Sequence, residues 1–251
     1  MGRGCAFLWS ALATPVLTRC LLLVAVLGLT ASDSASAQPS AEAVVEAWAD
    51  GWDRAWGRTS SVVLTERAEQ SVDGPRRDLR IETEGTLTLS PGRRPERRIN
   101  ETRVNGRRAE TERGPRGRDR LRRAFGPPGR EVLAPARLPV DWLPGAEPVR
   151  LVEDRLDGRA AWRVDMRSPA FDDLSVWFSR SESDPELLGV RGEGARPGGG
   201  RVVRDIRYAR ADGLDLPRLS ETTFTGRQRR RLRDYVVTLR AESRYIVREV
   251  R

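Results

Sequence analysis

The apolar positions follow helical spacing in one segment near the start of the chain. Within residues 40–57, one valine and three tryptophans recur at four-residue intervals: Val44, Trp48, Trp52 and Trp56. This spacing places them on one face of a helix, for which Ser40 is a suitable N-cap and Gly57 a suitable stop. We therefore predict an amphipathic helix over 40–57, whose tryptophan face needs a large apolar partner surface.

Beyond this helix the apolar pattern changes to the period of two that is typical of strands. In residues 81–89, for example, Ile81 and Leu87 face one way while Glu82 faces the other. The same reasoning predicts eleven strands: 60–72, 81–89, 97–104, 107–112, 149–156, 159–168, 173–180, 186–193, 201–211, 216–225 and 232–248. Eleven closely spaced strands with few helices indicate one large antiparallel sheet, curled or barrel-like.

Turn signals separate several of these strands. Asn105-Gly106 and Asp157-Gly158 are strong hairpin signals, because both residues of a type I′ turn need positive φ. Asp212-Gly213 and the run Gly198–Gly200 are also predicted turns. No helix is predicted after Gly198–Gly200, so this glycine run is not a phosphate-binding loop.

Residues 113–148 interrupt the strand pattern and are rich in proline, glycine and charge. A short helical piece is predicted at Asp119–Phe125, and the segment ends in an apolar, proline-punctuated stretch at 138–144. Connections of this length are typical of functional flaps or of disordered insertions. We predict that the segment contributes a basic, proline-rich helical plug to the domain.

The first 37 residues have the layout of a secretory signal. Arg3 and Arg19 supply positive charge, residues 21–30 form an apolar core, and Ala35–Ala37 is a small-residue cleavage site. An uncleaved anchor is the alternative, but the apolar run after Arg19 is shorter than the roughly 20 residues that span a bilayer. We predict cleavage after Ala37, a periplasmic location, and one domain over 38–251.

The mature chain lacks the residues of several common chemistries. Cys5 and Cys20 leave with the signal, and the chain contains no histidine, which excludes Cys and Ser-His nucleophiles and the usual zinc ligands. Cys20 also precedes the apolar core, so it is not a lipid-attachment site. The adjacent carboxylates of Glu153-Asp154 and Asp172-Asp173 would point to opposite faces of a strand. We expect no enzyme activity, no cofactor and no metal.

Positive charge is concentrated in one part of the chain. The formal net charge is +9, and residues 91–137 hold fifteen arginines against six acidic residues. This segment is either a solvated loop or a docking site for anionic headgroups or an acidic envelope partner, whereas an exported protein is not expected to bind nucleic acid. The candidate docking residues are Arg116, Arg118, Arg120, Arg122 and Arg123.

The order of these features resembles the LolA-like lipoprotein-carrier superfamily. The resemblance rests on the export signal, the opening amphipathic helix, the eleven strands, the proline-interrupted insertion, and the final strands from Gly213–Ser220 through Tyr235–Arg240 to Arg244-Tyr245. It implies an unclosed antiparallel half-barrel whose helices plug the apolar concave side. It also implies a carrier that holds the acyl chains of lipids or lipoproteins, or a relative that senses envelope components.

We therefore expect a monomeric carrier whose inner sheet face is more apolar than its own plugs can cover. An envelope sensor or scaffold that uses the same fold for protein contact is the alternative. The residues expected to contact lipid are apolar strand or tryptophan positions: Trp52, Leu87, Leu89, Trp142, Trp162, Val164, Leu174, Val176 and Phe178.

Overall fold

A computed structural model describes residues 38–73, 79–108, 138–139, 143, 145–181, 183–196, 200–230 and 233–251, and the structural statements below concern these residues. The chain divides between Ala37 and Gln38, and residues 38–251 form one compact unit. The division falls at the predicted cleavage site, while cleavage itself stays a prediction.

The single helix of the described chain, α1, runs from Ala41 to Gly57 as predicted. The side chain of Ser40 accepts a hydrogen bond from the backbone N–H of Ala43 at 3.1 Å, which caps the first turn. At the other end, Arg58 caps the helix in a right-handed conformation, so Gly57 ends α1 without a left-handed cap. No helix in the described part of the chain is long and apolar enough to cross a membrane.

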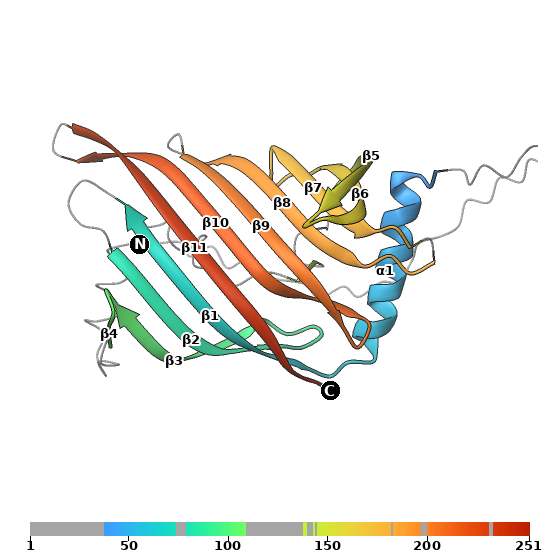
Figure 1. The fold of residues 1–251 in the computed structure, drawn as a ribbon, viewed down its shortest axis with the longest axis horizontal. Coiled ribbons are helices and arrows are strands. Elements are labelled where there is room, and N and C mark those ends of the chain that lie inside the picture. The colour runs from blue at the N-terminus through green and yellow to red at the C-terminus, as the bar shows by residue number, and fades with distance from the viewer. Residues whose placement is uncertain are drawn as a thin grey trace, which may run out of the picture. The chain divides into compact units, whose positions relative to one another are not determined.

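Eleven strands form one antiparallel sheet (Figure 1). Their bounds are β1 (Val62–Asp73), β2 (Leu79–Leu89), β3 (Glu96–Val104), β4 (Arg107–Arg108), β5 (Glu147–Leu156), β6 (Arg159–Arg167), β7 (Asp173–Ser179), β8 (Leu187–Arg196), β9 (Gly200–Ala211), β10 (Leu214–Arg230) and β11 (Arg233–Val250). The order across the sheet is β4-β3-β2-β1-β11-β10-β9-β8-β7-β6-β5. The edge strands β4 and β5 do not pair, so the predicted mainly β, unclosed sheet is confirmed.

The predicted hairpin turns are confirmed by their backbone angles. Asn105 and Gly106 have φ of 50° and 76°, Asp157 and Gly158 have 52° and 81°, and the third turn, at Asp212-Gly213, has the same signature. Positive φ at both central residues fits the right-handed twist of the flanking strands, which is why Asn-Gly and Asp-Gly occur there. The predicted turn at Gly198–Gly200 lies mostly outside the described residues, and Gly200 is already the first residue of β9.

The last two strands are longer than the sequence predicts. The predicted strand 216–225 ends well before the next one begins at 232, yet β10 continues to Arg230 and β11 begins at Arg233, with these two residues paired. The prediction failed because an arginine-rich strand gives no apolar periodicity by which it could be recognised.

The topology explains why one connection is so long. β1 pairs with β11, so the strands nearest the two ends of the compact unit lie side by side inside the sheet. The chain leaves at one edge from β4 and returns at the opposite edge with β5. At about 4.8 Å per strand, ten strand spacings amount to about 48 Å along the sheet. Residues 109–146 therefore have to connect the two edges, whatever else they do.

Candidate functional site

Most of the residues predicted to contact lipid lie in one hydrophobic cluster that includes α1. Seven of them are at most 2% exposed: Trp52, Leu87, Leu89, Val164, Leu174, Val176 and Phe178. All seven belong to the main hydrophobic cluster, which also contains Val44 and Trp48 of α1. We call this cluster the helix zone. Trp142 and the five docking arginines lie outside the described residues.

Aromatic contacts hold α1 against the inner face of the sheet, which is the face of Leu174, Val176 and Phe178. The ring centroids of Trp48 and Phe178 are 5.8 Å apart, and Trp48 and Trp52 are 6.0 Å apart. Trp56 stacks on Trp52 at 5.8 Å and remains partly exposed. The tryptophan stripe of α1 therefore seals the strand residues that were expected to contact a ligand.

A single polar contact anchors α1 within this apolar interface. The indole N–H of Trp48 donates to Asp215 Oδ2 at 2.8 Å, and the side chain of Asp215 is 1% exposed. Asp215 also accepts from the backbone N–H of Leu187 at 2.9 Å and from Arg210 at 2.9 and 3.1 Å. We call Trp48, Asp215 and Arg210 the helix latch. In the described chain, no other side chain of α1 makes a hydrogen bond or ion pair with the sheet.

The charges of the helix latch are compensated from two sides. Arg210 also pairs with Asp184 at 2.8 Å and donates to the carbonyl of Pro185 at 3.0 Å. Burial alone would lower the pKa of Arg210, but the hydrogen bonds and charges of Asp215 and Asp184 outweigh it, and the net pKa is raised. The guanidinium of Arg210 thus stays charged.

One buried donor beside the latch has no acceptor. The indole Nε1 of Trp52 is buried and finds no hydrogen-bond partner among the described residues. A buried donor without a partner costs about 1–3 kcal/mol. Burial of the Trp52 ring therefore stabilises the docked helix, while the unpartnered N–H of the same ring destabilises it.

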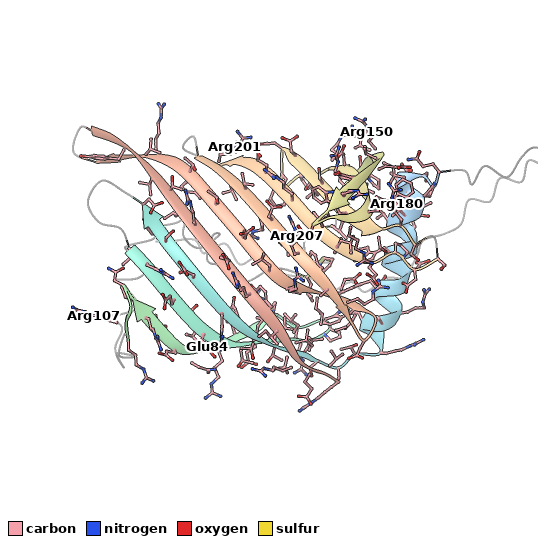
Figure 2. The ribbon with its side chains drawn as sticks, viewed as in Figure 1. Glu84, Arg107, Arg150, Arg180, Arg201 and Arg207 are labelled. Carbon is pink, nitrogen blue, oxygen red and sulfur yellow. The ribbon has the colours of Figure 1, made fainter. Side chains whose placement is uncertain are left out.

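Trp162 lies at the rim of the helix zone. It is half-buried, and the guanidinium carbon of Arg180 lies 4.8 Å from its ring centroid. Arg180 also pairs with Glu153 at 2.8 Å. Arg180, labelled in Figure 2, directly follows the last residue of β7. Of the predicted lipid contacts in the described chain, Trp162 is thus the most exposed. The guanidinium of Arg180 lies over its ring.

Polar residues interrupt the inner face in its middle. Residues directly opposite each other on paired strands share a face. One such row is apolar on β6 to β9, formed by Val164, Val176, Val190 and Ile206. The same row continues on β10, β11, β1, β2 and β3 as Ser220, Ser243, Ala68, Thr83 and Thr102. The inner face is therefore not continuously apolar, which corrects the sequence-based expectation.

Neighbouring rows widen this polar region. One of them places Thr222 and Gln70 on either side of Ala241, and the other contains Glu66. We call the following six residues the polar belt: Glu66, Gln70, Thr83, Ser220, Thr222 and Ser243. On its far side lie Val202, Phe224 and Leu239, which form a second hydrophobic cluster, the distal zone, together with Ala241 within the belt. The inner face thus carries two apolar zones with a polar belt between them.

Glu66 is the charged member of the belt. Its side chain is 2% exposed, pairs with Arg97 at 2.5 Å and accepts a hydrogen bond from the Tyr245 hydroxyl at 3.1 Å. A bulge between Glu84 and Gly85 shifts the pairing of β2 with β3 near Arg97, and a Cβ at Gly85 would lie 2.4 Å from the carbonyl oxygen of Arg98. Any side chain larger than that of glycine at position 85 would collide with the backbone of β3, which approaches β2 closely here.

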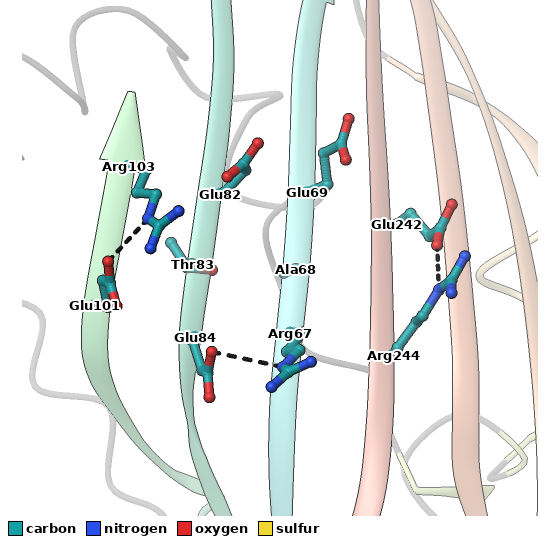
Figure 3. Close-up of a pocket in the computed structure, with 10 residues that line it drawn as sticks. All are labelled: Arg67, Ala68, Glu69, Glu82, Thr83, Glu84, Glu101, Arg103, Glu242 and Arg244. Atoms are coloured by element: carbon teal, nitrogen blue, oxygen red, sulfur yellow. Dashed lines mark hydrogen bonds and ion pairs between the residues drawn. The ribbon is translucent and has the colours of Figure 1, made fainter. Parts of the chain in front are cut away.

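A separate groove of about 520 Å³ lies on the outer face, over β11, β1, β2 and β3 (Figure 3). Eight charged residues line it, together with Ala68 and Thr83: Arg67, Glu69, Glu82, Glu84, Glu101, Arg103, Glu242 and Arg244. Figure 3 shows three ion pairs within it, among them Arg244 with Glu242 at 2.6 Å. The groove is therefore a predominantly charged surface with paired residues of both signs.

Carboxylates face one another in this groove. Glu69 of β1 lies opposite Glu82 of β2 and Glu242 of β11. Like charges directly opposite destabilise a sheet, and Arg80 offsets them by contacting Glu69 at 2.7 Å and Glu82 at 3.2 Å. Among the described residues, no three acidic side chains are arranged to hold a metal ion. We interpret this row of glutamates and Arg80 as a solvent-exposed network of ion pairs.

A third charged cluster, on β5 to β7, leads to a prediction about pH. The indole N–H of Trp177 donates to Asp154 at 3.0 Å and lowers the pKa of this carboxyl, as does the backbone N–H of Arg155 at 2.8 Å. A lowered folded-state pKa contributes stability above the unfolded-state pKa, and this contribution is lost as the pH falls through the folded-state pKa.

We therefore expect Trp177→Phe to be less stable than the unaltered protein at neutral pH, by a gap that narrows below about pH 4. Urea unfolding between pH 7 and pH 3 measures this gap. Because the lost ring contacts of Trp177 do not titrate, a gap that is constant over this range would show that the Asp154 hydrogen bond contributes nothing.

The polar belt was not predicted because its residues occupy positions of the strands that are otherwise apolar. In β1, Glu66 and Gln70 alternate in phase with Val62, Leu64 and Ala68. Polar residues in the buried phase of a strand are the signal that could have found the belt. The latch gave no such signal, because Trp48 and Asp215 are 167 residues apart and only the register of the sheet brings them together.

Together these features define a class of protein: an open antiparallel sheet with a helix docked on its inner face. No family model and no curated protein matches the sequence. Among solved structures, a LolA superfamily protein from Nitrosomonas europaea is similar over 85% of this chain and 96% of its own, with 11% identity and a TM-score of 0.31. A putative outer membrane lipoprotein-sorting protein domain from Vibrio parahaemolyticus is similar over 82% and 92%, with 12% identity and a TM-score of 0.35.

A complex of MucA and MucB from Pseudomonas aeruginosa is also similar, over 80% of this chain and 93% of that one, with 12% identity and a TM-score of 0.20. What those proteins bind is a property of theirs, and the function of this chain rests on its own residues.

Proposed function

We propose that this chain is an exported, non-catalytic binding protein of the periplasm that holds acyl chains on the inner face of its sheet. The supporting observation is the helix zone, in which α1 covers the apolar strand residues with its tryptophan stripe. The stripe occupies the place that a hydrocarbon ligand would take. Acyl chains of a lipid or lipoprotein would therefore bind by displacing α1, and would not need a cavity that is already open.

The free energies of apolar burial are compatible with such an exchange of helix for ligand. Each tryptophan buries about 150–250 Å², worth about 4–6 kcal/mol at about 25 cal/mol per Å². The two buried tryptophans of α1 thus contribute about 10 kcal/mol. An acyl chain of about fourteen methylenes, at about 0.8 kcal/mol each, contributes about 11 kcal/mol. The two occupants are balanced closely enough for one to replace the other.

The test uses the exported protein purified from a periplasm. Native mass spectrometry with lipid extraction shows whether a ligand is bound, and a fluorescent fatty acid measures uptake directly. Binding should quench the fluorescence of Trp48 and Trp52 and shift the probe to an apolar environment. A ligand-free mass together with no uptake of the probe would contradict the proposal.

An envelope sensor or scaffold is the second candidate, and the charged groove on the outer face favours it. Eight charged side chains on one sheet face could dock a partner through complementary charge, and such contacts weaken with salt. Pull-downs from envelope extracts at low and high salt distinguish the two candidates. A partner that is lost at high salt and no bound lipid would favour the scaffold, whereas a salt-insensitive partner would count against it.

A further inference from the structure

One cation lies where the apolar helix zone meets solvent. Trp162 of β6 is directly opposite Phe178 of β7, so the two rings share the inner face of the sheet, and Phe178 in turn contacts Trp48 of α1. The guanidinium carbon of Arg180 lies 4.8 Å from the ring centroid of Trp162. Arg180 is thus placed at the end of the apolar surface that a chain in the position of α1 would follow.

The ring of Trp162 supports this cation. Trp162 is half-buried and packs against the helix zone, which holds its ring in place. A guanidinium over an aromatic face gains a favourable interaction with the ring and keeps its N–H donors available at its edges. These donors form a planar fork that fits the oxygens of a carboxylate or a phosphate. Arg180 therefore has the chemistry of an anion-binding side chain.

The partner that Arg180 has within the protein is a carboxylate, and the pair is open to exchange. Glu153 of β5 lies opposite Trp162 and contacts Arg180 at 2.8 Å. The side chains of Glu153 and Arg180 are 61% and 37% exposed, and an ion pair exposed to this extent contributes little to stability. Arg155, two residues along β5 on the same face of the strand, adds positive charge beside Glu153. An incoming anion could therefore replace the Glu153 carboxylate.

We propose that Arg180, supported by Trp162, binds the anionic headgroup of the ligand while the acyl chain occupies the helix zone. The headgroup is a carboxylate or a phosphate, and Glu153 takes its place when no ligand is bound. Arg180 is then a residue that determines ligand specificity. This inference rests on the proposed function and names the ligand class more closely, as an amphiphile with a negative charge at the end of its hydrocarbon chain.

The two members of the ion pair should have opposite effects on binding. Arg180→Gln should weaken binding of a fatty acid and of an alkyl phosphate about tenfold, because a charge-assisted hydrogen bond is lost, and should leave a fatty alcohol of equal chain length unaffected. Glu153→Gln removes the competing carboxylate and should strengthen binding of both anions by up to about fivefold. Displacement of an uncharged fluorescent acyl probe at neutral pH measures these affinities.

A matched control lies on the same strand as Trp162. Arg159 also pairs with an exposed glutamate, Glu186, at 2.9 Å. It lies three residues before Trp162 on β6, and therefore on the opposite face of the strand. Arg159→Gln makes the same change in net charge as Arg180→Gln, and it should leave the affinities for all three ligands unchanged.

The outcomes are distinguishable. Equal losses for anion and alcohol in Arg180→Gln, an equal loss of anion affinity in Arg159→Gln, or weaker anion binding by Glu153→Gln would each overturn the headgroup site. Calorimetry with inorganic phosphate tests the need for the chain, and binding as tight as that of the alkyl phosphate would also overturn the inference. If the alcohol binds as tightly as the anions, the proposed function stands without the headgroup site. If no probe binds the unaltered protein, both fail.

Discussion

Asp215→Ala should lower the free energy of unfolding by about 3–5 kcal/mol, because it removes one partner of a buried ion pair. The substitution takes the acceptor from the Trp48 indole, from the Leu187 backbone N–H and from Arg210 at once. Arg210 keeps Asp184 and the Pro185 carbonyl, so the loss should stay within this range. Urea denaturation at neutral pH measures it.

A matched control lies on the outer face. Asp205 also pairs with arginines, at 3.2 Å with Arg207 and 3.8 Å with Arg191, but its side chain is 22% exposed. Asp205→Ala should cost no more than about 1 kcal/mol, as is usual for solvated pairs. Equal losses for the two variants would mean that the helix latch does not anchor α1.

Trp52→Ala should raise the affinity for an acyl probe, because it weakens the helix that competes with the ligand. Truncating a buried tryptophan costs about 3–5 kcal/mol, of which the unpartnered indole N–H returns about 1–3 kcal/mol. A net weakening of about 2 kcal/mol increases the population of undocked helix roughly thirtyfold. The apparent dissociation constant should fall by about the same factor while the docked form remains dominant.

Trp177→Ala provides the comparison, since Trp177 packs in a small cluster with Leu156, Ala161 and Leu188, away from α1. It should lower stability without strengthening binding. If both tryptophan variants gain affinity equally, then general loosening of the fold explains the effect. If neither gains affinity, α1 does not compete with the ligand.

The sequence was sufficient for the helix, for most of the strands and for their arrangement in an antiparallel sheet, but not for the order of the strands. Positive-φ turns and strict alternation are local properties, so Asn105-Gly106 and Asp157-Gly158 could be located without coordinates. The tryptophan face of α1 was equally visible, because four-residue spacing is itself a helical property. Strand ends were less certain where arginine continued past the apolar pattern, as in β10.

The arrangement of the inner face depends on distant pairings that the sequence does not display. The belt exists because Ser220, Ser243 and Thr83 fall into one row when β10, β11, β1 and β2 align. A shift of a single residue would turn each of these side chains to the other face. Predicting the apolar positions correctly therefore did not show that α1 covers some of them and that polar residues separate the others.

Locking α1 to the sheet tests the displacement of the helix most directly. A Cβ at Gly51, in the middle of α1, would lie 3.5 Å from Oδ1 of Asp184 in the turn between β7 and β8. Side chains at these two positions are in contact, so cysteines are placed there, oxidised, and checked for disulfide formation by the loss of free thiols before uptake is measured. The mature sequence contains no other cysteine to compete.

The same double variant, Gly51→Cys with Asp184→Cys, is measured oxidised and reduced, so that the substitutions themselves cancel. Displacement of α1 predicts that the oxidised protein takes up no acyl probe and that reduction restores uptake. Equal uptake in the two states would show that the ligand binds without moving the helix, and would contradict the mechanism proposed for this protein.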